Sequence, residues 1–182
     1  MAESYSVVSY IPDPLAGFVD GLRGRFDPGL AAWRAHVTIL PPRELPEPLD
    51  EPIELLRRQC AQIEPFDAAI GGVSTFWPVT GVVYFSFGAG AGRLLELHDA
   101  LNTGELERRE VYAYIPHVTI AQELDEDRAY SVLGDVEHEW KQYKDGPTFR
   151  VESLFLVRRT PENLWIDLAP IRLGGLLAGS FT

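Results

Sequence analysis

Short apolar runs and amphipathic stretches alternate along the first half of the chain. The segment SYSVVSYI at residues 4–11 is rich in Val and Tyr, which favour strands, and the Pro-Asp-Pro sequence after it predicts a turn. Apolar residues recur at helical spacing in two stretches on either side of a β-branched run, AHVTIL, which the Pro41-Pro42 pair is expected to end. This pattern predicts strands at residues 4–11, 35–40, 66–77 and 82–87, and helices at residues 15–26 and 51–63.

The second half repeats this order of elements. Residues 92–102 form an amphipathic pattern, and residues 125–140 form another with acidic side chains at the expected helix N-terminus, where the helix dipole favours them. Further strands are predicted at residues 114–122, 149–159 and 163–171. The predicted order is β-α-β-α-β followed by β-α-β-α-β-β, which indicates a split α+β or α/β architecture with pseudo-twofold symmetry.

A short motif marks the repeat. AHVTIL at 35–40 returns as PHVTIA at 116–121, so that 81 residues separate His36 from His117. The same offset aligns residues 82–88 with 163–169 and places Tyr84 over Trp165. A period near 80 residues is too long for a solenoid and indicates a duplicated lobe. We therefore predict one domain over residues 1–182, with lobes of roughly 1–80 and 81–182 and a first strand that the lobes can share.

Alternation along a strand gives each motif a polar face. His36 and Thr38 point to one side and the β-branched residues between them to the other, and the same holds for His117 and Thr119. If the lobes face each other, two imidazoles and two hydroxyls meet in one cleft. An imidazole with a pKa near 6.5 can be neutral in one copy and charged in the other, which suits in-line displacement at phosphorus between a base and an acid.

The composition limits the kinds of molecule that the protein is expected to bind. The net charge of -11 disfavours long duplex or non-specific RNA, while a small anionic substrate in a locally basic cleft remains compatible with it. The single Cys60 forms no intrachain disulfide, and the N-terminal segment lacks a basic stretch before its first proline. No apolar run approaches the roughly 20 residues that span a bilayer. We expect a cytoplasmic monomer without a membrane anchor.

The paired HVTI motifs in this succession of elements resemble the 2H phosphoesterase superfamily, which includes the bacterial 2'-5' RNA ligase-like proteins and cyclic phosphodiesterases. The resemblance covers nearly the whole chain. It implies a two-lobed, pseudo-symmetric α+β fold with antiparallel sheets and flanking helices around a central cleft. It also implies that His36 and His117 are catalytic, that Thr38 and Thr119 bind the phosphate, and that no metal or other cofactor takes part. In this family the second histidine activates water and the first protonates the leaving group, although a substrate bound the other way round exchanges these roles.

The resemblance leaves the substrate open. Pro-Pro-Arg-Glu directly follows the first motif, and the chain is acidic; both features depart from the RNA-ligase-like members and favour a small substrate. The predicted function is hydrolysis of a cyclic phosphate, such as a 2',3'-cyclic nucleotide or the cyclic phosphate at an RNA end. The alternatives are a hydrolase or ligase of 2'-5' phosphodiesters and an inactive module that binds nucleotides.

Three further residues are candidates for substrate binding. Tyr84 and Trp165 can stack a nucleobase, with ordinary sheet packing as the alternative. Arg43 follows the first motif and can approach a phosphate, as can Arg158 and Arg159, although most arginines are solvated surface residues.

Overall fold

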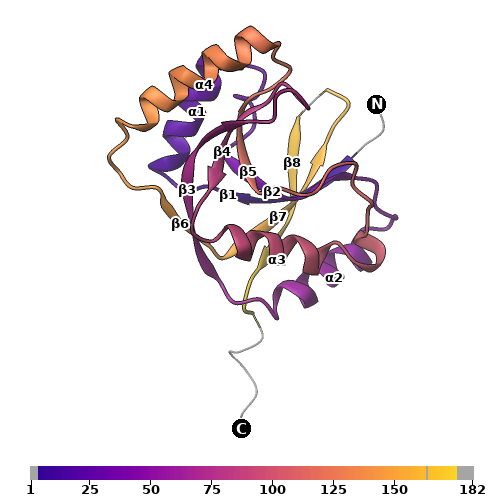
Figure 1. Cartoon of the computed structure of the whole chain (residues 1–182). Coiled ribbons are helices and arrows are strands. Elements are labelled where there is room, and N and C mark those ends of the chain that lie inside the picture. The colour runs from indigo at the N-terminus through magenta and orange to yellow at the C-terminus, as the bar shows by residue number, and fades with distance from the viewer. Residues whose placement is uncertain (1–3, 163, 176–182) are drawn as a thin grey trace.

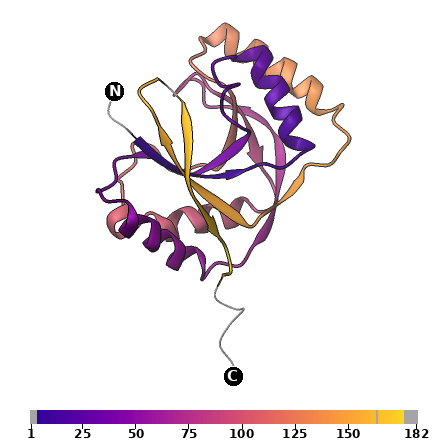
Figure 2. The same cartoon turned by 180° about the vertical axis from the view of Figure 1, so that it is seen from behind.

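The strands build two four-stranded antiparallel sheets in the computed structural model, which describes residues 4–162 and 164–175. The first sheet has the order β2-β1-β7-β8 and the second the order β5-β4-β3-β6 (Figures 1 and 2). The strands are β1 (Ser4–Tyr10), β2 (His36–Arg43), β3 (Phe66–Thr75), β4 (Val83–Phe87), β5 (His117–Ala121), β6 (Thr148–Val151), β7 (Ser153–Arg159) and β8 (Trp165–Arg172). The helices are α1 (Leu15–Phe26), α2 (Asp50–Cys60), α3 (Ala91–Leu101), α4 (Glu126–Trp140) and the short 3-10 helix η1 (Gly104–Leu106). The predicted α+β class is confirmed.

Each sheet combines strands from both halves of the chain. β3 of the first half joins the second sheet, and β7 and β8 of the second half complete the first sheet. The strand predicted at 149–159 is in fact two strands, because the chain passes from one sheet to the other at Glu152. The division into lobes at residue 80 therefore does not follow the sheets, and β1 belongs to the first sheet alone.

The two motif strands occupy equivalent places in the two sheets, but the other strands correspond in a different way from the prediction. Val8 of β1 pairs with Thr38, and Tyr84 of β4 pairs with Thr119, so β4 corresponds to β1. The predicted match of residues 82–88 with 163–169 was wrong, and Asn163 lies outside the described residues. One offset cannot hold for both strands of the repeat, because Tyr10 pairs with His36 and Ser86 with His117 across connections of unequal length.

The helices pack as two pairs, and each pair combines one helix from each half of the chain. α1 and α4 lie together on the second sheet, and α2 and α3 lie together beside the first (Figure 1). Phe18 of α1 shows the first packing, because its ring contacts Phe85 of β4 at 6.2 Å and Trp140 of α4 at 6.0 Å between centroids. A helix that follows the first strand in sequence thus covers the sheet that carries the second motif.

The two motif strands are edge strands that contact each other. β2 ends the first sheet, β5 ends the second, and the two strands meet between the sheets. Val37, Ile39, Val118 and Ile120 are fully buried in the shared core, which leaves the His and Thr side chains on the opposite face of each strand, as predicted. β2 continues through Pro41 and Pro42 instead of ending there, because an edge strand tolerates residues without an N–H. Among the helices described, none is long and apolar enough to cross a membrane.

Candidate functional site

The two imidazoles are held in the same way. Nδ1 of His36 donates a hydrogen bond to the carbonyl oxygen of Arg34, and Nδ1 of His117 donates to that of Ile115, both at 2.7 Å. Because a carbonyl can only accept, each Nδ1 carries the hydrogen and each Nε2 is left as a proton acceptor. In both motifs the partner lies two residues before the histidine, so the backbone that enters the strand sets the tautomer and the ring orientation.

Motif side chains from both halves share one cleft. A space of about 190 Å³ is lined by residues of both halves, among them His36, Thr38, Thr119, Arg23, Trp33 and Trp165. His117 is not one of the lining residues, but it is close enough to His36 for a charge on one imidazole to oppose a charge on the other. Three of the four side chains predicted to converge, those of His36, Thr38 and Thr119, therefore line one cleft.

Burial governs the charge of both histidines. Burial, together with the nearby guanidinium group of Arg23, lowers the pKa of His36 to about 3. Burial also lowers the pKa of His117. Without a ligand both rings are neutral near pH 7, in contrast to the expected pair of one neutral and one charged imidazole. A bound anion would favour the charged form, so protonation of one ring is coupled to binding.

The family of the chain follows from this arrangement and from its sequence. The family model of the 2'-5' RNA ligase superfamily matches residues 11–163. The chain belongs to this superfamily of 2H phosphoesterases. A protein of Oceanobacillus iheyensis named as a presumed phosphoesterase is 32% identical over 142 residues, which cover 78% of this chain and 83% of the relative. A similarly named protein of Halalkalibacterium halodurans is 28% identical over 172 residues, covering 94% and 98% of the two chains.

Solved structures show the same fold. TT0787 of Thermus thermophilus has a TM-score of 0.66 at 19% identity and covers 95% of this chain and 99% of its own. LigT of Escherichia coli in complex with 3'-AMP has a TM-score of 0.63 at 14% identity, with coverage of 94% and 98%. The chain thus has the fold of these two proteins, and its own side chains define what is particular to it.

Aromatic rings pack against both imidazoles. Trp165 lies 4.6 Å from the His36 ring between centroids and stacks on Trp33 at 4.8 Å. Trp165 belongs to the edge strand β8, so the first sheet must curl to bring it to the opposite edge strand β2. Tyr84 packs against His117 at 5.3 Å and stacks on Phe76 at 4.1 Å.

The two aromatic candidates therefore differ. Trp165 and Trp33 are half-buried and line the cleft, so a ligand can reach them. Tyr84 is only 7% exposed, with one face covered by Phe76, which leaves it a packing role in place of the predicted base-stacking role. Trp33 carried no motif and was missed. Of the other two arginines considered, Arg159 lines the cleft and lies over the Trp33 ring.

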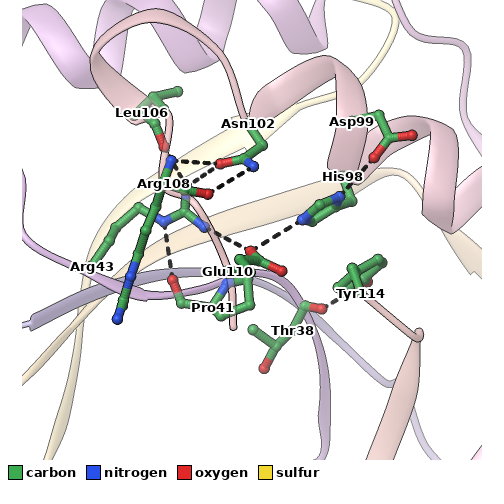
Figure 3. Close-up of polar contacts among 10 residues, drawn as sticks. All are labelled: Thr38, Pro41, Arg43, His98, Asp99, Asn102, Leu106, Arg108, Glu110 and Tyr114. Atoms are coloured by element: carbon green, nitrogen blue, oxygen red, sulfur yellow. Dashed lines mark hydrogen bonds and ion pairs between the residues drawn. The ribbon is translucent and has the colours of Figure 1, made fainter. Parts of the chain in front are cut away.

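Arg43 does not face the cleft, contrary to the prediction. Its side chain is buried, and its Nε donates to the carbonyl oxygen of Pro41 at 3.0 Å (Figure 3). Nη1 donates to Oδ1 of Asn102 at 2.8 Å and to the carbonyl oxygen of Leu106, and Nη2 forms an ion pair with Glu110 at 3.4 Å. Its donors are thus engaged by the segment that follows α3. These bonds from Arg43 hold the segment after α3 against β2.

The same network continues toward the motifs. Glu110 also contacts Nε2 of His98 at 3.2 Å, and the His98 ring stacks on Tyr114 with centroids 4.0 Å apart (Figure 3). The Tyr114 hydroxyl donates to the backbone carbonyl oxygen of Thr38 at 2.8 Å. The chain between η1 and β5 is therefore held at several points before it enters the second motif of this phosphoesterase.

Arg23 is the cleft residue that the sequence interpretation missed most clearly. It lies in the last turn of α1, is 1% exposed, and reaches the cleft between the two motifs. A signal was present, because Arg23 falls between Val19 and Phe26 on the apolar stripe of its helix, where a charged side chain is unusual. No group of three or more His, Cys, Asp or Glu residues that could hold a metal ion occurs within residues 4–162 and 164–175.

Proposed function

We propose that the protein is a phosphodiesterase that opens a small cyclic phosphate, such as a 2',3'-cyclic nucleotide or the cyclic phosphate at an RNA end, by acid–base catalysis between His36 and His117. The observation that carries the proposal is the matched pair of imidazoles, each with Nδ1 bonded to a backbone carbonyl, on two edge strands that meet at one cleft. Such a pair can remove a proton from water on one side of phosphorus and return one to the departing oxygen on the other.

The threonines complete this chemistry. Thr38 and Thr119 line the cleft on the same strand faces as the histidines, and their hydroxyls can donate hydrogen bonds to the non-bridging oxygens of the phosphate. Two neutral donors and two imidazoles provide what the displacement needs without a metal ion. The proposed reaction is therefore independent of metals.

We infer the roles of the two histidines from their charge environment. Arg23 disfavours a charged His36, whereas burial alone lowers the pKa of His117, so the proton that arrives with an anionic substrate resides more readily on His117. We assign His36 as the base that activates water and His117 as the acid that protonates the ribose oxygen. This is the reverse of the assignment that the family resemblance implies.

Cleft size and charge favour a small substrate. The cleft of about 190 Å³ is smaller than the roughly 300–1,000 Å³ pockets that enclose drug-sized ligands, so it can hold the reacting phosphate while the nucleoside lies at the rim. Trp33 and Trp165 are half-buried lining residues of the cleft and are suitable stacking partners for a base. Structures of Escherichia coli LigT with 3'-AMP, NADP+ and ATP support small nucleotides as ligands of this fold.

A second candidate function is hydrolysis or ligation of 2'-5' phosphodiesters on short oligonucleotides, which the superfamily assignment favours. It would use the same four side chains. We also propose that the protein acts as a cytoplasmic monomer, in agreement with its single, buried Cys60. Size-exclusion chromatography with light scattering tests the monomer, and an eluted mass near twice 20.3 kDa would contradict it.

The function is tested on a substrate panel. The protein is incubated with 2',3'-cyclic nucleotides, ADP-ribose cyclic phosphate and 2'-5' oligoadenylate, with and without EDTA, together with His36→Ala and His117→Ala. His138→Ala is the matched control, because His138 is exposed on α4. We expect turnover of a cyclic phosphate that resists EDTA, is lost in both motif variants and persists in the control. Loss of activity with EDTA contradicts the metal-free reaction, and binding without turnover favours a nucleotide-binding module.

A further inference from the structure

Arg23 is anchored to both motif-bearing segments. Its Nε donates to the backbone carbonyl oxygen of Thr119 at 2.9 Å, and its Nη1 donates to that of Trp33 at 3.0 Å. Thr119 belongs to the second motif, and Trp33 lies three residues before His36. Because α1 packs on the second sheet, this one side chain spans the junction of the two halves. Two hydrogen bonds fix the plane of the guanidinium group and leave little freedom in its orientation.

One edge of this guanidinium group is unused. Nη2 has no hydrogen-bond partner among residues 4–162 and 164–175, and Arg23 lines the same cleft as His36, Thr38 and Thr119. The two engaged nitrogens face backbone carbonyls, which carry no net charge. The remaining donors are therefore available to a group in the cleft.

Within residues 4–162 and 164–175, no carboxylate oxygen lies within hydrogen-bond distance of the buried Arg23 charge. Oδ1 of Asp20 lies 3.8 Å from Nη1, which is beyond hydrogen-bond distance, and this oxygen is itself buried without a hydrogen-bond partner among the described residues. The carboxylate of Asp27 accepts a hydrogen bond from the backbone N–H of Gln122 at 3.1 Å. A buried cation is costly unless an anion or several hydrogen bonds compensate it. An anion bound in the cleft would complete the compensation that the described residues leave partial.

We infer that Arg23 is a phosphate-binding residue, whose guanidinium group pairs with the non-bridging oxygens of the phosphate between His36 and the two threonines. The inference rests on the proposed function for the identity of the anion. Thr38 and Thr119 are neutral donors, so Arg23 supplies a buried, fixed positive charge beside them, in addition to Arg159, which also lines the cleft. A preoriented cation in a water-poor site stabilises charge that develops on phosphate oxygens in the transition state.

Inorganic phosphate is the probe for the first test, and the full chain is used throughout. Calorimetry measures the dissociation constant for phosphate in the wild type and in two variants. Arg23→Met keeps much of the side-chain length but removes the charge. Arg23→Lys keeps the charge but not the planar guanidinium group with its paired N–H donors. Arg25→Met is the matched control, because Arg25 lies on the same helix, is 52% exposed and pairs with Glu139. We expect Arg23→Met to bind phosphate at least about tenfold more weakly, Arg23→Lys to be intermediate, and the control to match the wild type. Wild-type phosphate affinity in folded Arg23→Met overturns the inference.

A spectroscopic test needs no variant. Phosphate is titrated into wild-type protein while NMR follows the Nε–H signal of Arg23 and the ring signals of His36 and His117. We expect all of them to shift with one dissociation constant. Movement of the histidine signals without the Arg23 signal would overturn the inference, even if Arg23→Met does not fold. In folded Arg23→Met the pKa of His36 should rise, since the guanidinium group that lowers it is gone.

Kinetics separate this inference from the proposed function. For a substrate that turns over, we expect Arg23→Met to lower kcat by about 100-fold or more, as removal of a preoriented donor does elsewhere. Turnover that is insensitive to Arg23→Met keeps the function and overturns the inference. Phosphate binding that depends on Arg23, in a protein that turns over no member of the panel, overturns the function and keeps the inference.

Discussion

The hydroxyl of Tyr114 donates a 2.8 Å hydrogen bond to the backbone carbonyl oxygen of Thr38, and so links the segment entering the second motif to the strand of the first. The next residue, Ile115, accepts the hydrogen bond from Nδ1 of His117. Two neighbouring residues thus contact both motifs, and the relative position of His117 and Thr38 depends on one short stretch of chain.

Tyr114→Phe removes only this hydroxyl, because the ring can still stack on His98. The carbonyl of Thr38 loses its side-chain donor, and we expect unfolding to become easier by about 1 kcal/mol. Because the two motifs are then less firmly aligned, kcat should fall several-fold with little change in KM. Steady-state kinetics and urea unfolding measure both effects. Tyr112→Phe is the control, since Tyr112 is 61% exposed; an equal loss of kcat in the control would contradict a specific role for Tyr114.

Arg43→Met should destabilise the protein without altering substrate affinity. Removal of one partner of a buried ion pair typically costs about 3 kcal/mol, because the other charge is left unpaired, here on Glu110, whose side chain is 16% exposed. Urea unfolding should show a loss of this order, while KM of the folded variant stays near the wild-type value. Arg57→Met removes an exposed i,i+3 pair with Glu54 and should cost less than about 1 kcal/mol. A large rise in KM for Arg43→Met would restore the role in phosphate binding that the sequence suggested.

Stability should fall as the pH is lowered from 7 toward 4. The pKa of His36 is about 3 in the folded protein, against an ordinary value of 6.5, so in this window the unfolded chain binds a proton that the folded chain does not. The contribution of His36 to the free energy of unfolding is fully present above pH 6.5 and decreases below it by about 1.4 kcal/mol per pH unit. His117 adds to the decrease, because its pKa is lowered as well.

Urea unfolding of the wild type and of His36→Gln between pH 7.5 and 4.5 checks this dependence. The variant lacks the titrating ring, so its curve should be flatter, and the difference between the two curves isolates His36 from the carboxylates. Parallel curves would show that His36 takes up its proton equally in both states.

The assignment of acid and base is testable with a good leaving group. The p-nitrophenolate of a p-nitrophenyl phosphodiester departs without protonation, so loss of the acid should matter little for this substrate. With His117 as acid, His117→Ala should retain most wild-type activity on this ester while it loses activity on cyclic nucleotides. His36→Ala should lose both activities. If His36→Ala instead retained activity on this ester, the result would support the assignment that the family resemblance implies.

Trp165 should contribute to affinity for the nucleoside. Stacking of a base on an aromatic ring is worth about 1–3 kcal/mol, so Trp165→Ala should raise KM for a cyclic nucleotide about tenfold. Trp165→Phe keeps a ring and should recover much of the loss. Leu164→Ala alters the exposed neighbour and serves as control. Unchanged KM in Trp165→Ala would assign this ring to packing against His36.

Local pattern was sufficient for the motif strands, because alternation of polar and β-branched residues directly sets which side chains share a face. It also predicted every long helix, including α1 with its three glycines. Arg43 and Arg23 show where local pattern fails. Arg43 was expected to line the cleft but is bound by the segment after α3, whereas Arg23 fits a helix pattern yet reaches β5. Both positions depend on which sheet each helix covers, and contacts between distant segments decide that.

The exchange of strands between the sheets has a consequence for how this enzyme can be divided. A fragment ending near residue 80 would carry β3 without either of its neighbours, and the remaining fragment would carry β7 and β8 without β1 beside them. Neither half can therefore serve as a minimal catalytic unit. The chain consists of two halves that exchange strands and does not divide into two independent lobes. An ancestor of half this length would have had to dimerise to complete its sheets.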